Sequence, residues 1–277
     1  RWLPAAMVAP TPVSALLHAV AVVKAGVFTV LKVIVYIFGI DTLAGISQDD
    51  WLMYIAAFTV IAASCVALKK DNLKARLAYS TVSQLSYIIL GAALASSLGI
   101  IGGGMHIAMH AFGKITLFFC AGAILVASHK TEVSEMDGLG RVMPITFLFF
   151  FIGSLSVIGL PPLGGSWSKW YLMLAAADAG QVIFMFVFMI SSLLNIAYLM
   201  PLVARGFFSE AKDNGNHHED DHHGEPSFWN GVRFGNVREA PPFCLLAMAI
   251  TSVGCVLLFF YADKIYRLLA PVAGIQG

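Results

Sequence analysis

The chain has 277 residues, of which 58% are hydrophobic and 12% are charged, and its formal net charge is +1. A typical soluble domain carries about twice this share of charged residues, because it needs polar side chains to cover its core. These numbers exclude a soluble globular domain, a disordered chain, and a nucleic-acid-binding protein with a basic face.

Neither the cysteines nor the glycines form a recognisable cofactor motif. The run of glycines at 99–104 lies between apolar segments, where a helix contact or a tight turn is the expected role. No two cysteines form a Cys-x-x-Cys pair, so we expect small buried hydrophobic side chains rather than disulfides or metal ligands. The sequence therefore predicts no cofactor, no metal and no enzyme active site. The four cysteines are Cys65, Cys120, Cys244 and Cys255.

Several apolar stretches are long enough to cross a bilayer, which takes about 20 helical residues. They predict an all-α integral membrane protein with about seven transmembrane helices. The chain begins at Arg1 and shows no signal peptide, so we expect a fragment or split half of a longer membrane protein. The stretches are 11–39, 51–68, 77–97, 104–127, 143–178, 181–204 and 243–262.

The fifth stretch is interrupted by Gly-Leu-Pro-Pro-Leu-Gly-Gly at 159–165. Prolines flanked by glycines cannot maintain a regular helix, so this segment predicts a broken helix. Broken helices at membrane depth are tolerated only where they line a cavity or pack inside protein. The break therefore indicates a functional position. The residues that would form it are Pro161, Pro162, Gly164 and Gly165.

The polar segments predict three parts and an orientation. We expect a membrane domain at 1–208, a flexible polar loop at 209–241, and a C-terminal helix and tail at 242–277. The run HHEDDHH at 217–223 could bind a divalent metal, but a solvated loop is the simpler interpretation. Eleven loop cations fall on one side of seven crossings and two on the other, which places the basic loops in the cytoplasm.

Four lysines fall inside the apolar stretches, and no acidic residue lies well inside any of them. An ammonium near the bilayer centre costs about 2.5 kcal/mol or more, and desolvation favours the neutral amine, which can exchange protons. Lys32 lies near enough to a helix end to reach the interface instead, and the sequence leaves that alternative open. The four are Lys24, Lys32, Lys114 and Lys169.

The fourth stretch places His106, His110 and Lys114 at spacings of four residues. This spacing puts all three on one helix face, about 6 Å apart per step. Imidazoles act as both donor and acceptor near neutral pH, so such a row, with intervening water, can pass protons. Satisfied interior histidines are the alternative. Haem ligation is disfavoured by the lysine and by the lack of a second histidine pair.

In the first stretch, His18 precedes Lys24 by six residues. Six residues correspond to about 240° around a helix, so the two side chains do not share a face. They could serve successive water positions around the helix, or His18 could simply pack while Lys24 alone is functional.

Lys169 directly follows the predicted break, with Ser166 and Ser168 as expected hydroxyl partners. This arrangement fits the exit or turning point of a proton path. Lys74, at the basic end of the third stretch, is either a positive-inside anchor or a proton entry residue.

Four motifs together give the chain a family resemblance. They lie at 2–19 (WLPAAMVAPTPVSALLHA), 71–87 (DNLKARLAYSTVSQLSY), 106–118 (HIAMHAFGKITLF) and 159–172 (GLPPLGGSWSKWYL). In order and spacing they resemble the proton-translocating antiporter-like subunits of respiratory complex I and of Mrp-type cation/proton antiporters. The resemblance runs from residue 2 to about 207.

The resemblance implies a fourteen-helix fold with two inverted repeats, in which the seven stretches correspond to the eighth to fourteenth helices. Lys114 with His106 and His110 would match the central proton-path group, and Lys24 with His18 the link between half-channels. Lys169 would match the terminal lysine on the second broken helix, and Lys74 a lysine in the next span. The family's first half is missing from this sequence.

The expected function is proton or cation/proton translocation through this Lys/His relay. The chain would act as a subunit of an NADH:quinone oxidoreductase or of a Mrp-type antiporter, and Lys-Trp-Tyr at 169–171 and the loop at 136–144 slightly favour the antiporter. Enzyme status stays open, because only the whole complex would be a translocase. A solute permease, with Trp167 and Trp170 as pocket residues, or a purely structural subunit is the alternative.

The expected partners are other membrane subunits, the lipid bilayer and protons, with Na⁺ as a second candidate ion and no nucleic acid. The expected location is the bacterial inner membrane.

Overall fold

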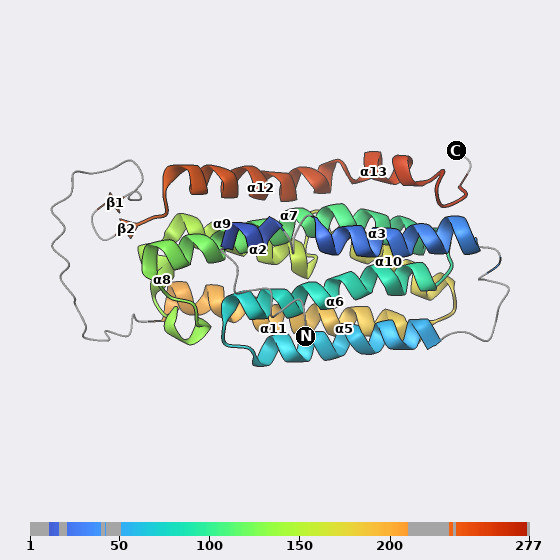
Figure 1. Ribbon diagram of the computed structural model, residues 1–277, viewed down its shortest axis with the longest axis horizontal. Coiled ribbons are helices and arrows are strands. Elements are labelled where there is room, and N and C mark those ends of the chain that lie inside the picture. Colours follow the sequence, from blue (N-terminus) through green and yellow to red (C-terminus); the bar gives the residue numbers. More distant parts are fainter. Residues whose placement is uncertain are drawn as a thin grey trace.

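Long apolar helices dominate the computed structural model, which describes residues 11–16, 21–39, 42, 51–209, 233–234 and 237–275. Helices satisfy their own backbone hydrogen bonds, which a chain in lipid requires. Figure 1 shows the long helices lying side by side along one direction. In chain order the elements are α2 (Thr11–Ala15), α3 (Val22–Lys32), η3 (Val33–Phe38), α5 (Trp51–Lys69), α6 (Leu73–Ala93), α7 (Ser97–Ser128), η4 (Val133–Glu135), α8 (Leu139–Val142), α9 (Pro144–Ile158), α10 (Gly165–Asp178), α11 (Val182–Phe208), β1 (Arg233–Phe234), β2 (Val237–Arg238), α12 (Pro242–Phe260) and α13 (Ala262–Leu269).

Four of the described helices, α5, α7, α11 and α12, are long and apolar enough to cross a membrane. The all-helical membrane class is therefore confirmed, whereas seven crossings remain a prediction. The stretch predicted at 11–39 is not one regular helix, because α2 ends at Ala15, α3 begins at Val22, and its last turns are the π-helix η3. No proline or glycine between 13 and 25 signals this interruption.

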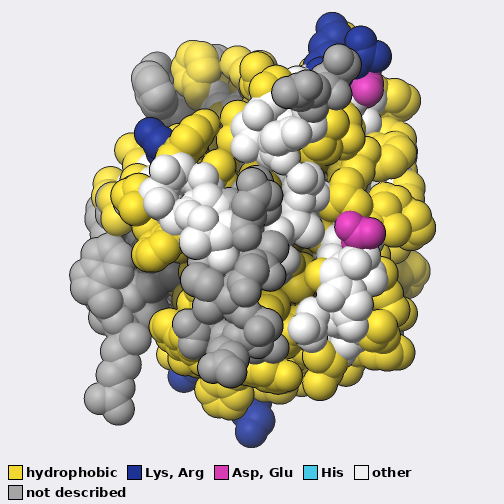
Figure 2. Space-filling view, turned by 90° about the vertical axis from the view of Figure 1, so that its right-hand side faces the viewer, with side chains coloured by type: hydrophobic (Ala, Val, Ile, Leu, Met, Phe, Trp, Pro, Cys, Tyr) yellow, Lys and Arg dark blue, Asp and Glu magenta, His cyan; other side chains and the backbone are white. Residues whose placement is uncertain are grey.

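The outer surface of the bundle is apolar. Large hydrophobic side chains are exposed along the long helices, including Phe58 on α5, Leu193 on α11 and Ile250 on α12. Figure 2 looks onto one end of the bundle, where hydrophobic side chains are prominent and charged side chains appear at only a few places. The apolar sides of the long helices fit contact with lipid or with other membrane helices.

The predicted burial of all four cysteines is wrong for two of them. Cys120 and Cys255 are buried, but Cys65 and Cys244 are exposed, and all four are free thiols. An outward position next to lipid is as apolar as the core, so hydropathy does not separate the two environments.

Two helix starts differ from the predicted stretches because of capping residues. The stretch predicted at 77–97 is α6, which begins earlier because the Asn72 side chain accepts a hydrogen bond from Ala75 N at 3.1 Å. The stretch predicted at 104–127 is α7, whose first turn is capped by Ser96 Oγ, which accepts from Gly99 N at 3.1 Å. Side chains at such caps satisfy backbone donors that have no partner within the helix.

The long helix α7 lies at the centre of the packing and contacts α6, α9, α10 and α12. Its glycine run is helical and makes helix contacts, as the sequence predicts. A Cβ on Gly102 would lie 3.0 Å from the backbone nitrogen of Leu172 on α10. The absence of a side chain therefore lets α10 approach α7 closely.

The predicted break at 159–165 is confirmed. Helix α9 ends at Ile158, Gly159 has a φ of +90°, and α10 begins at Gly165. The loop is tied to α12, because Gly164 N donates to Cys255 O at 3.0 Å. Both half-helices pack on α7, and the unwound segment between them is buried at Leu163 and Gly164 but exposed at Leu160, Pro161 and Pro162.

Two of the loops that the sequence predicts to be basic meet the end of α11 at one end of the bundle. Asn72 Nδ2 donates to Glu132 Oε1 at 3.0 Å, and Arg205 Nε lies 2.7 Å from Asp137 Oδ1. Arg141 Nε also donates to Phe207 O at 2.9 Å. The loops after α5 and α7 and the last turns of α11 are therefore held together near α8, on the left in Figure 1.

The break provides a test of the packing. A Cβ on Gly165 would overlap the backbone carbonyl of Ser156, so we expect Gly165→Ala to destabilise the protein by about 1–3 kcal/mol. Gly103→Ala is the matched control, because its Cβ would lie 3.5 Å from the nearest atom, Ile88 O. Thermal unfolding in detergent, followed by size-exclusion chromatography, should show a lower midpoint for the first variant only. Equal midpoints would contradict the close approach at the break.

Candidate functional site

Three of the four lysines in the predicted spans are buried. The exposed fraction is 6% for Lys24, 0% for Lys114 and 4% for Lys169. Lys32 is exposed, and its amine lies 5.7 Å from the centroid of the Phe28 ring. Lys32 therefore lies on the surface of the described bundle, apart from the three buried lysines, and its reach to the membrane interface stays a prediction.

The two histidines of α7 are buried and lie one above the other. The ring centroids of His106 and His110 are 5.7 Å apart, and their planes are nearly parallel. His106 and His110 therefore share one face of α7, but each ring forms its hydrogen bonds with residues of other helices. His106 Nδ1 lies 2.9 Å from Ser168 Oγ on α10, and His106 Nε2 lies 3.1 Å from Gln84 Oε1 on α6.

Within the buried site, one direct contact between titratable groups joins α3 to α7. Lys24 Nζ lies 2.7 Å from His110 Nδ1, and it also donates to Ile107 O at 2.9 Å. At this distance either the ammonium donates to a neutral imidazole or the imidazole donates to a neutral amine. One proton can therefore pass directly between Lys24 and His110. His18, the expected companion of Lys24, lies outside the described residues.

Lys114 is connected to α6 and α11 rather than to the histidines. Its amine donates to Ser80 Oγ at 2.6 Å and to Leu77 O at 3.2 Å. Ser80 Oγ lies 2.7 Å from the hydroxyl of Tyr198, which in turn contacts Asn195 Oδ1. All of these side chains except that of Tyr198, which is 1% exposed, are fully buried. The contacts form a continuous row from Lys114 to Asn195.

One direction of hydrogen bonding satisfies every contact in this row. A phenol carries one proton, so Tyr198 donates either to Asn195 or to Ser80. When it donates to Asn195, the Ser80 hydroxyl is free to donate to Tyr198 and to accept from Lys114. Every member then has a partner, which is the arrangement that a proton relay requires.

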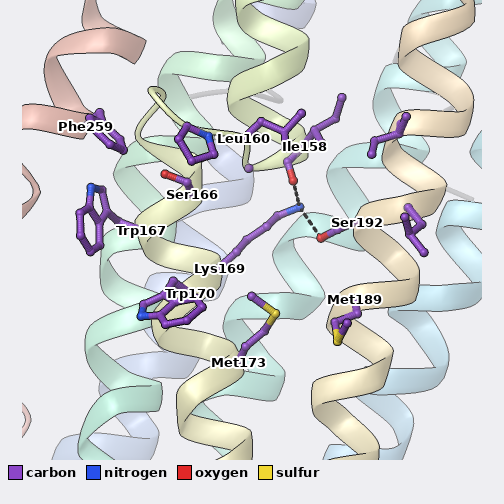
Figure 3. Close-up of a pocket in the computed structure, with 14 residues that line it drawn as sticks. Ile158, Leu160, Ser166, Trp167, Lys169, Trp170, Met173, Met189, Ser192 and Phe259 are labelled. Carbon is purple, nitrogen blue, oxygen red and sulfur yellow. Dashed lines mark hydrogen bonds between the residues drawn. The ribbon is translucent and has the colours of Figure 1, made fainter.

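Lys169 lies at the break, as the sequence predicts, but its partners are different ones. Its amine donates to Ile158 O at 2.9 Å and to Ser192 Oγ on α11 at 3.1 Å, and it lies 5.0 Å from the centroid of the Tyr87 ring. Figure 3 shows this side chain crossing from α10 to α9 and α11. Ile158 O is available because α9 ends there, and a cation is favourable at a helix C-terminus.

The expected hydroxyl partners of Lys169 are wrong. Ser166 Oγ donates to Leu163 O at 2.8 Å, and Ser168 Oγ donates to Gly165 O at 3.1 Å and contacts His106. Both serines follow the helix of α10, whereas the lysine side chain extends away from it. Sequence proximity therefore identified the wrong hydroxyl groups.

Lys74 is not joined to this network. It is half-buried in the first turn of α6, at the end of the bundle where the loops meet. Six residues, about 9 Å along a helix, separate it from Ser80. Between them in sequence, Arg76 donates to Lys70 O at 2.8 Å and to Tyr198 O at 3.0 Å, which ties the ends of α6 and α11 together.

The sequence analysis missed the polar positions of α11. Ser192, Asn195 and Tyr198 recur at intervals of three residues in α11, where Ser191 is the only other polar residue between 182 and 204. This spacing places them along one side of the helix. A polar stripe in the stretch at 181–204 is a visible signal, and it would have predicted that α11 faces the lysines.

Comparisons with known sequences give one consistent result. A family model described as NADH:quinone oxidoreductase/Mrp antiporter, TM, matches residues 1–195. The chain is 36% identical over 212 residues to NADH-quinone oxidoreductase subunit L of Rickettsia bellii, covering 76% of this chain and 32% of the relative. It is 31% identical over 266 residues to subunit N of Desulforudis audaxviator, covering 95% and 51%. The chain thus spans about a third to a half of the length of these relatives.

Solved structures show the same fold. A chain of the Mrp complex from Dietzia sp. DQ12-45-1b superposes with a TM-score of 0.77 at 23% identity, covering 99% of this chain and 54% of that one. A chain of respiratory complex I from Thermus thermophilus superposes with a TM-score of 0.69 at 20% identity, covering 91% and 50%.

Three buried nitrogen atoms predict bound water. Gln84 Nε2, His110 Nε2 and Asn195 Nδ2 have no hydrogen-bond partner among the described residues. A buried polar atom without a partner is costly, and an ordered water commonly satisfies it. We expect an experimental map at high resolution to show a water within about 3 Å of each atom. Direct protein partners at all three atoms would contradict this expectation.

Proposed function

The chain belongs to the NADH:quinone oxidoreductase/Mrp antiporter transmembrane family, and from this membership we propose that it carries protons, or exchanges a cation for protons, across a membrane. The observation that carries the proposal is the group of three buried lysines, each held by neutral acceptors and one of them in direct contact with a buried histidine. A charge at such depth is expensive unless it is functional.

The first part of the proposed path uses the direct contact between α3 and α7. Lys24 and His110 exchange a proton across 2.7 Å. His106 continues the row through the stacked rings, and its contacts with Gln84 and Ser168 set the tautomer that it adopts. Because the two imidazoles are not hydrogen-bonded to each other, a water at His110 Nε2 would complete this step.

The second part of the proposed path connects Lys114 to Lys169 along α11. Protons leaving Lys114 pass through Ser80 to Tyr198, and the amide oxygen of Asn195, which only accepts, holds the Tyr198 hydroxyl in place. Ser192, which accepts from Lys169, lies three residues before Asn195 on the same helix, about 5–6 Å away between Cβ atoms. A water bound by the unpartnered Asn195 Nδ2 would carry the proton across this distance.

Repulsion between the amines supplies the driving interaction. In a low-dielectric interior, a proton arriving on one lysine disfavours a proton on its neighbours. No aspartate or glutamate forms an ion pair with Lys24, Lys114 or Lys169 in the part of the chain that the structure describes. A charge change in an adjoining segment or subunit would therefore shift which lysine is protonated.

The finer features of the fold follow from the same proposal. The chain would form the second inverted repeat of a fourteen-helix subunit, with seven crossings, and its polar loop at 209–241 would separate the membrane domain at 1–208 from the C-terminal segment at 242–277. The convergence of the basic loops at one end supports an orientation with that end in the cytoplasm of a bacterium. Lys74 would then lie on the entry side.

The relatives suggest two kinds of assembly. Subunits L and N are named as parts of an NADH-quinone oxidoreductase, and the solved structures include a Mrp complex. We propose that this chain likewise associates with other membrane subunits. Purification from native membranes would distinguish the two assemblies, since redox subunits would identify the first and small antiporter subunits the second.

The buried lysines give the main functional prediction. Lys114→Ala or Lys169→Ala should reduce proton flux about 100-fold or more, as expected for loss of a proton-transfer group, while assembly on native gels is retained. Flux can be followed with a pH-sensitive dye in membrane vesicles containing the intact protein. Lys32→Ala, at the exposed lysine, is the matched control and should transport normally. Wild-type flux in both buried-lysine variants would disprove the relay.

The row along α11 gives a separate prediction. Tyr198→Phe removes one hydroxyl from the row and should lower flux about tenfold, equivalent to roughly 1.4 kcal/mol in the barrier. Tyr79→Phe is the control, because that ring is only partly buried and lies near the exposed Lys70. Unchanged flux in Tyr198→Phe would remove α11 from the path without affecting the contact between Lys24 and His110.

A further inference from the structure

A pocket with a volume of about 710 Å³ lies beside the helix break. Figure 3 shows side chains of α10, α11 and α12 around it. Pockets of roughly 300–1,000 Å³ enclose ligands of drug size. The walls are almost entirely apolar and include Leu160, Trp167, Trp170, Met173, Met189 and Phe259.

One basic group lies among these apolar side chains. Lys169 lines the pocket, and its amine is held by Ile158 O and Ser192 Oγ. An ammonium has three donors, so one remains for a ligand. The other polar side chains of the lining are Ser166 and Ser192, and Ser166 is hydrogen-bonded to Leu163 O. The polar group that the pocket offers to a ligand is therefore the basic amine of Lys169.

The pocket opens toward the apolar outside of the bundle. At its rim, Trp170 is 53% exposed and Leu193 is 64% exposed. A ligand would therefore arrive from the hydrocarbon of the membrane rather than from water. Its body must be apolar, and its one polar end must suit an amine.

We propose that this pocket binds a fatty acid from the membrane, with the carboxylate at Lys169 and the chain along Trp170 and Met189. The neutral acid enters from the lipid and transfers its proton to the neutral amine, which leaves a carboxylate beside an ammonium. The two charges then satisfy each other through a charge-assisted hydrogen bond. The volume suits one chain, so a two-chain phospholipid fits poorly.

The bound acid would act as an inhibitor. The carboxylate holds the Lys169 amine in its charged form, and an amine that cannot release its proton no longer takes part in exchange. This consequence rests on the proposed function, whereas the binding itself does not. Binding is therefore the property to test.

A photoactivatable palmitic acid tests the pocket in native membranes that contain the intact protein. Crosslinked peptides mapped by mass spectrometry should carry label at Trp170, Met173 or Met189. Excess palmitic acid should compete, while hexadecanol, which has the same chain and no acid, should not. Label on Tyr54 and Phe58, which are exposed on α5, reports ordinary lipid contact and should not respond to either competitor.

Two variants make the test specific. Lys169→Gln should raise the concentration of palmitic acid needed for half-maximal labelling about tenfold. Met189→Trp fills the pocket while keeping the lysine, and it should abolish the competed label even where Lys169→Gln does not assemble. Equal competition by hexadecanol, competition by a two-chain phospholipid, or no competed label in the membrane would overturn the proposal. Since labelling requires no flux, a failed relay leaves the result unchanged.

Discussion

The structure depends on the way in which three amines are held in an apolar bundle without carboxylates. Each has the same pair of acceptors, one backbone carbonyl and one side chain that can take part in proton exchange. Lys24 has Ile107 O and His110, Lys114 has Leu77 O and Ser80, and Lys169 has Ile158 O and Ser192. A carboxylate would fix the ammonium form, whereas neutral acceptors satisfy it at lower strength. The lysines can therefore change protonation state without breaking an ion pair.

Helix interruptions help to supply these surroundings. Ile158 O has no partner within its helix because α9 ends there, and this end of the helix favours a cation. Lys24 is the third residue of α3, close to the helix N-terminus, where a cation is disfavoured. The helix end near Lys169 thus favours the charged form of its amine, whereas the helix end near Lys24 disfavours it. This difference between Lys24 and Lys169 would give the row of amines a preferred direction.

Much of this arrangement could be predicted from the sequence because it follows from the cost of charge and from proline chemistry. The lysines stand out in apolar stretches, the break follows from Pro161 and Pro162, and the common face of His106 and His110 follows from helical spacing. The position of Lys32 could not be predicted, because a long side chain near a helix end can turn either way. The same holds for the exposed cysteines, since lipid and core are equally apolar.

The partners of the site residues lay beyond sequence reasoning for a different reason. Helical periodicity determines the direction of a side chain but not the neighbouring helix that it meets. His106 and His110 share a face, yet one contacts α6 and α10 while the other contacts α3. The serines nearest in sequence to Lys169 are occupied within α10, and its hydroxyl partner comes from α11. Such pairings depend on tertiary packing.

Charge coupling and proton transfer have different distance requirements. In this site the lysines meet the first requirement, and the neutral hydrogen-bonding side chains meet the second. Coulomb interactions between amines act over many ångströms in a low-dielectric interior, so the lysines can influence one another without contact. Proton transfer needs hydrogen-bond distance, which only Lys24 and His110 provide directly among the buried lysines and histidines of the described bundle. Between Lys114 and Lys169, the proposed carriers are the uncharged Ser80, Tyr198 and Ser192, with Asn195 positioning the Tyr198 hydroxyl. The amines would therefore determine where the charge rests, and the neutral side chains of α6 and α11 would determine how fast it moves.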